Sequence, residues 1–106
     1  MSWSKGVPRD DYLSGISAEA LNLHAIFAQN IKEARKARGW SQIEAAERCL
    51  LSRGAYRAVE KGELGTAIGV YWLVLDTFGL LDGVAELAAP HKDEIGRRNR
   101  EVRAKR

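Results

Sequence analysis

Apolar residues from residue 17 onward recur at helical spacing. Leu23, Phe27, Ile31 and Ala34 follow one another at steps of four, four and three, which places them on one face of a helix. The charged residues of the same stretch fall largely on the other face, and Gly39 is typical of a C-terminal helix cap. The pattern therefore predicts a first helix that begins near residue 17 and ends before residue 39.

Two short helices are predicted next. Ser41 and Glu44 have the S-x-x-E spacing of a capping box, in which each side chain satisfies a backbone amide at the start of a helix. Ser52 is the next natural N-cap, and Tyr56 and Val59 are spaced to face a core before the following glycine. Because only three to four residues connect these helices, they must cross at a steep angle, as in a helix-turn-helix.

The remaining chain predicts two further helices and two tails. Residues 68–78 are apolar nearly all round, which indicates a fourth helix buried on more than one side, in the core and in a subunit interface. Asp82 predicts the cap of a fifth helix through residues 86–89, which Pro90 ends. Residues 1–16 lack periodicity and predict a flexible arm, and Gly96 argues against one stable helix in residues 91–106. We thus expect an all-α fold with five helices in one domain at residues 17–90.

Length and composition suit one folded domain. The chain has 106 residues, of which 45% are hydrophobic and 29% are charged. No apolar run approaches the ~20 residues that span a bilayer, and the first residues lack the order of a secretion signal. We therefore expect a cytoplasmic protein without a membrane partner.

Few residues offer reactive or metal-binding chemistry. Cys49 is the single cysteine, and neither it nor His24 or His91 has a partner at metal-ligand spacing. We interpret Cys49 as a core thiol and both histidines as solvent-facing. Since no nucleophile, base and orienting group can be assembled, we expect no enzymatic activity, no metal and no cofactor.

Basic residues are concentrated at the C-terminal end. The formal net charge is +3, and residues 91–106 hold seven basic side chains against three acidic ones. Such a tail can follow the phosphates of a nucleic acid, or it can remain unfolded until it meets a partner. Both interpretations stay open.

Residues 41–63, SQIEAAERCLLSRGAYRAVEKGE, resemble the helix-turn-helix of the Cro/cI phage-repressor superfamily. The shared pattern is S-Q-x-E-x-A, a short turn, and a second serine followed by two apolar positions and E-x-G. The resemblance extends over residues 27–80. The family normally has glycine in the turn, whereas this chain has Leu50, for which a positive φ carries strain.

The resemblance implies a sequence-specific repressor that binds double-stranded DNA as a homodimer on an inverted repeat. The third helix would enter the major groove, and the positions that correspond to base-facing ones are Ser52, Arg53, Gly54, Arg57 and Ala58. The positions that correspond to phosphate contacts are Ser41, Gln42, Gly65 and Thr66. Arg35 and Glu60 correspond to a structural ion pair. Taken alone, a capping box or two arginines four residues apart would be ordinary features of a solvated helix.

Residues 62–96 resemble the small proteins encoded beside HipA-like kinases, in which a helix-turn-helix is followed by an apolar helix, a glycine-leucine step and a proline. This resemblance implies a HipB-like antitoxin that represses its own operon and holds a kinase toxin. Two other hypotheses remain. One is a free-standing regulator of the phage or restriction-controller type, and the other is a protein-interaction module that lacks DNA binding.

Overall fold

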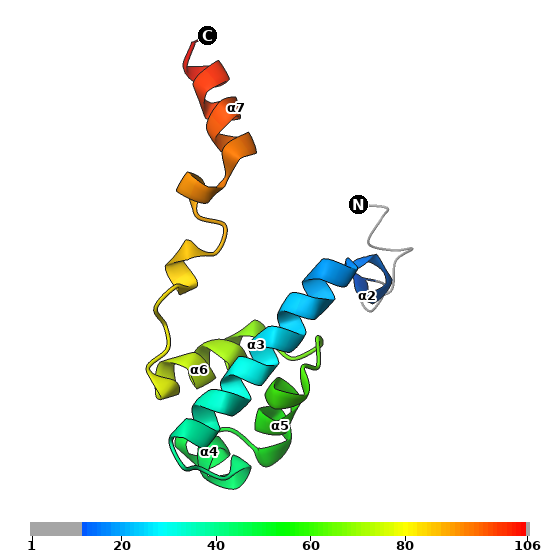
Figure 1. Ribbon diagram of the computed structural model, residues 1–106, viewed down its shortest axis with the longest axis vertical. Coiled ribbons are helices and arrows are strands. Elements are labelled where there is room, and N and C mark those ends of the chain that lie inside the picture. The colour runs from blue at the N-terminus through cyan, green and yellow to red at the C-terminus, as the bar shows by residue number, and fades with distance from the viewer. Residues whose placement is uncertain (1–11, 106) are drawn as a thin grey trace.

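The computed structural model describes residues 12–105, and within them every regular element is helical (Figure 1). The elements are α2 (Tyr12–Gly15), α3 (Ala18–Ala37), α4 (Gln42–Arg48), α5 (Arg53–Lys61), α6 (Ile68–Phe78), the 3₁₀ turns η2 (Val84–Glu86) and η3 (Pro90–Lys92), and α7 (Glu94–Ala104). The all-α prediction is confirmed. Of the predicted N-terminal arm, residues 12–15 form a short helix and residues 1–11 lie outside the described part.

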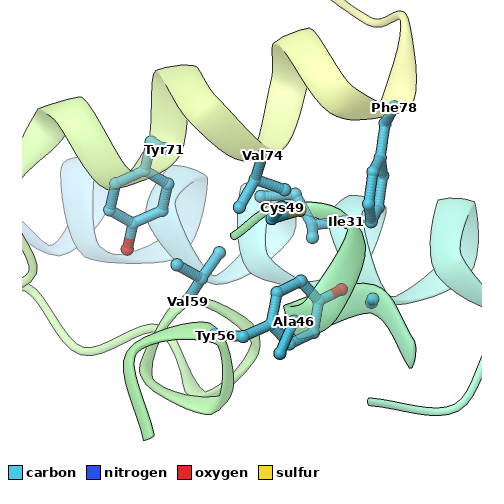
Figure 2. Close-up of a cluster of buried hydrophobic side chains, with 9 residues drawn as sticks. Ile31, Ala46, Cys49, Tyr56, Val59, Tyr71, Val74 and Phe78 are labelled. Atoms are coloured by element: carbon cyan, nitrogen blue, oxygen red, sulfur yellow. The ribbon is translucent and has the colours of Figure 1, made fainter. Parts of the chain in front are cut away.

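One core holds α3, α4, α5 and α6 together. Its buried side chains come from all four helices: Ile31, Ala45, Ala46, Cys49, Tyr56, Val59, Tyr71, Val74 and Phe78. Figure 2 shows most of them converging between α6 and the helices below it. Cys49 is fully buried as a free thiol, so its interpretation as a core residue is confirmed.

Three of the four residues predicted for the buried face of α3 pack against the core, with Ile31 buried and Phe27 and Ala34 partly buried, and Leu23 is the exception. Leu23 is 57% exposed, whereas Ala28, Ile31 and Arg35 are buried. The core covers only the C-terminal half of this 20-residue helix, and the N-terminal half runs past it (Figure 1). His24, one position further round the helix, takes the inward place instead: its Nε2 lies 3.2 Å from the Tyr71 hydroxyl. The expectation that His24 faces solvent was therefore wrong.

Two predictions for the C-terminal region were also wrong. The expected fifth α-helix is only the 3₁₀ turn η2, because positive φ values at Gly83 (89°) and Ala88 (57°) interrupt helical backbone on both sides. Asp82 does not cap it. Conversely, residues 94–104 form α7 despite Gly96, which donates its backbone N–H to the Asp93 carboxylate and thus lies at the capped start.

Candidate nucleic-acid interface

The α4–turn–α5 unit begins and ends at the capping residues that the sequence indicated. Ser41 and Glu44 form the complete capping box, with 3.0 Å between side chain and backbone in both directions. Ser52 Oγ accepts the backbone N–H of Ala55 at 3.1 Å, and Gly62 ends α5 with φ 73°. These caps set the length of both helices, since unpaired end amides and carbonyls would otherwise cost stability.

Leu50 forms the turn between the two helices in a left-handed conformation. Its φ is 58°, and its side chain is 87% exposed. The helices thus keep the usual connection of four residues, and Leu50 accepts the strain of a conformation that glycine would adopt freely. Leu51, the next residue, packs against the core instead.

Glu60 ties α5 to both preceding helices. Arg35 on α3 donates from Nε to Glu60 Oε2 at 2.6 Å and from Nη2 to Oε1 at 3.1 Å. Gln42 on α4 donates from Nε2 to the same Oε1 at 3.0 Å. The third Arg35 donor, Nη1, binds the Trp40 carbonyl at 2.9 Å. Because Arg35 also reaches the residue just before α4, this network holds all three helices at a set angle.

The network is removed from water. The side chains of Arg35 and Glu60 are 10% and 3% exposed. The hydrogen bond to Glu60 raises the pKa of Arg35 against the opposing effect of burial. Burial acts to raise the pKa of Glu60, but hydrogen bonds from Arg35 and Gln42 outweigh it and hold that pKa below its ordinary value. Both partners therefore stay charged at neutral pH.

The five positions expected to face bases lie together at the start and along one side of α5. Ser52, Arg53, Gly54 and Arg57 are exposed, and Ala58 is half-buried. Within residues 12–105, Arg53 and Arg57 form no hydrogen bond and no ion pair, and a Cβ at Gly54 would meet nothing within 4 Å. The two guanidinium groups are thus unpaired donors on an unobstructed helix surface.

The four positions expected to contact phosphate have different surroundings. Ser41 is exposed at the start of α4, and Gln42 keeps a second amide hydrogen beyond the one that Glu60 accepts. Gly65 is exposed in the loop before α6. Thr66 is half-buried, near the Tyr71 phenol whose hydrogen bonds go to the His24 ring and the Glu63 carbonyl.

A second structural cation was missed by the sequence analysis. Arg38 donates from Nη2 to the Phe78 carbonyl at 2.5 Å and from Nη1 to the Ala34 carbonyl at 2.8 Å. Its guanidinium also lies 5.2 Å from the Phe78 ring centroid, and Arg48 lies 4.4 Å from that of Trp40. No spacing rule links residues forty positions apart, so only the fold reveals that Arg38 joins α3 to the end of α6.

Charge favours an anionic partner in this part of the chain. Residues 32–61 carry eight basic side chains against four acidic ones. Within residues 12–105 no group of three or more His, Cys, Asp or Glu side chains could hold a metal ion. No described helix combines the length and apolar character that crossing a membrane requires.

Comparison with known proteins finds a family to which this unit is similar. The family model described as helix-turn-helix matches residues 31–80, which include α4, α5, α6 and most of the α3 segment that contacts them. No curated protein and no solved structure matches the chain. The geometry of α4, the turn and α5 agrees with this match, so residues 31–80 are similar to the helix-turn-helix family in both sequence and structure.

Proposed function

We propose that this chain is a cytoplasmic transcriptional repressor in which α5 reads operator DNA in the major groove. The observation that carries the proposal is a contrast within α5. Arg53 and Arg57 are exposed and have no partner among residues 12–105, whereas the Glu60 side chain on the same helix is buried and bound by Arg35. Arginine can donate two parallel hydrogen bonds to guanine O6 and N7. The helix is thus held at one end and offers donors along its open side.

Residues beside α5 would fix the register on the sugar-phosphate backbone. Ser41 and the second amide hydrogen of Gln42 are assigned to a phosphate oxygen, together with the backbone amides at Gly65 and Thr66. Such contacts add affinity for any DNA and no sequence preference.

The reading residues can be tested by substitution. Arg53→Ala and Arg57→Ala should each cost about 1–3 kcal/mol on the preferred operator with little loss on random DNA. Lys61→Ala, at the far end of α5, is the matched control and should weaken both complexes to a similar, smaller extent. Preserved operator preference in both arginine variants would refute the assignment.

A homodimer requires two half-sites on the operator. Footprinting on the chain's own promoter should show them separated by one helical turn, about 34 Å, or by a multiple of that distance.

The partner proposal is narrower and rests on the sequence of residues 62–96. Their resemblance to the small proteins beside HipA-like kinases supports an antitoxin that represses its own operon and binds a kinase toxin. Isolation of the chain from its host, at native expression, should recover a stoichiometric kinase-fold partner. Specific DNA binding without such a partner would instead favour a free-standing regulator, and absence of specific DNA binding would favour a protein-interaction module.

A further inference from the structure

An apolar groove with a volume of about 690 Å³ opens beside the helix-turn-helix. The N-terminal half of α3, one side of α6 and the segment through η2 enclose it, and the side chains that set its character are Phe27, Ile68, Tyr71, Trp72, Leu75 and Leu87. Ile68 is 64% exposed and Leu87 is 66% exposed. One side of α6 faces the core and another faces this groove, which explains why the helix is apolar nearly all round. Large apolar side chains in the groove remain exposed to solvent.

Helix α7 stands apart from that groove. Figure 1 shows it at the far end of the molecule from α4, and the element it packs against is η3. Ile95 is 73% exposed and Val102 is 53% exposed. Since they are seven residues apart on one helix, they share a face. The chain therefore holds both an open apolar groove and a separate helix with an uncovered apolar face.

The charges of the two features are opposite. The residues that line the groove include one carboxylate, Asp82, and no lysine or arginine. The chain segments that carry these lining residues, 24–31 and 62–90, hold three further carboxylates and no lysine or arginine: Glu63, Asp76 and Glu86. Residues 94–105 contain five basic side chains and two acidic ones. At 100° per residue, Arg98 and Lys105 flank the Ile95–Val102 face on one side and Arg103 flanks it on the other. Opposite potentials of this kind favour association and set its register.

The accessible surface is large for the size of the chain. It amounts to 8049 Å², whereas a compact monomer of 11.8 kDa exposes about 5900 Å². The radius of gyration is 17.8 Å, against about 13 Å for a compact domain of this length. A stable dimer needs about 800 Å² from each partner. The surface of this chain exceeds that of a compact monomer by more than this amount.

We propose that two copies of this chain exchange their C-terminal helices, so that α7 of each copy lies in the apolar groove of the other. Ile95 and Val102 face the apolar floor, while Arg98, Arg103 and Lys105 lie beside Asp82 at its rim and near the other carboxylates of the same segments. This contact would supply the dimer that the proposed operator reading requires, and in that respect it rests on the proposed function. The contact itself needs no DNA, and no residue of α4 or α5 lines the groove.

Cysteine cross-linking tests the placement directly, because the native Cys49 is fully buried and will not compete. Full-length chains that carry Ile68→Cys are mixed with chains of different mass that carry Val102→Cys, and the mixture is oxidised without DNA. We expect a disulfide between unlike chains. The control replaces Ile68→Cys with Glu47→Cys, an exposed α4 position far from α7, and should give none. Equal cross-linking of both pairs would overturn the proposal.

Sedimentation equilibrium supplies the second measurement. The wild-type chain should dimerise, and Ile95→Asp/Val102→Asp should weaken the dimer by at least about tenfold. Ile68→Glu, which changes the groove and leaves α7 intact, should do the same, so unfolding of α7 cannot account for both results. Glu101→Gln, about 110° round α7 from the Ile95–Val102 face, should leave the dimer unchanged.

Two results would overturn the exchange: a monomeric wild-type chain, or a dimer that tolerates both apolar-face variants. If those variants instead lower only the salt-dependent affinity for DNA, α7 is a phosphate-binding element and the exchange is wrong. Loss of operator preference in a chain that still dimerises would contradict the proposed function and leave the exchange standing. The two proposals therefore fail in different assays.

Discussion

Removal of the Glu60 carboxylate should be the most damaging single change near α5. In Glu60→Ala the Arg35 guanidinium, with its side chain 10% exposed, loses two charged hydrogen bonds and stays in its buried position. Gln42 loses its acceptor as well. Breaking a buried ion pair by removing one partner costs about 3–5 kcal/mol. Against a total stability of about 5–15 kcal/mol, that is a large fraction.

Urea denaturation followed by circular dichroism and by the fluorescence of Trp40, whose carbonyl Arg35 binds, measures this cost. Thermal unfolding should shift by at least about 12 °C, since 1 kcal/mol corresponds to about 4–8 °C in a domain of this size. Arg35→Met/Glu60→Leu is the control: with both charges replaced by apolar groups, it should be more stable than Glu60→Ala. A loss below about 1 kcal/mol in Glu60→Ala would refute the view that this pair is a buried structural element.

Three further changes follow from the same structure. Lowering the pH should remove the contribution of the Glu60 carboxylate to the free energy of unfolding, because its pKa is lower in the folded chain than in the unfolded chain. That contribution is complete above the unfolded pKa of 4.5 and is lost as the pH falls through the folded pKa. The stability of Glu60→Gln should not show this loss on acid titration. Leu50→Gly should raise the free energy of unfolding by about 0.5–1 kcal/mol, because the relieved left-handed strain at this exposed residue outweighs the extra backbone entropy that glycine loses on folding. Leu50→Ala should bring no such gain. Gly96→Ala should fail to increase helicity at 222 nm, unlike Asn99→Ala, because its Cβ would lie 2.1 Å from Asp93 Oδ2 and break the cap of α7.

The central helices were predictable because their signals are local. Ser41 with Glu44, and Ser52 before a helix that a glycine ends, specify caps within four residues of the helix ends. The start and end of α6 were likewise visible from its continuous apolar run before Gly79. Where such signals were weak, prediction failed: Asp82 is a suitable cap residue in sequence, but the positive φ of Gly83 directs the following backbone into a 3₁₀ turn.

The candidate site was partly predictable. That Arg53 and Arg57 share one side of α5 follows from sequence spacing, because residues three or four apart lie on one face of a helix. The link from Gln42 to Glu60 and the bond from Arg38 to the Phe78 carbonyl could not be predicted from spacing. Each joins residues that only the crossing of two helices brings within hydrogen-bond distance.

The sequence by itself determined the helix-turn-helix, since caps, glycine stops and apolar spacing act over a few residues and leave little choice of local backbone. Tertiary structure alone decided how far along α3 the apolar face is covered, how Arg35, Gln42 and Glu60 share one buried network, and that α7 lies away from the core. The physical reason is that burial depends on what a helix packs against. Periodicity marks an apolar side, but only the neighbouring helices determine how much of that side is covered.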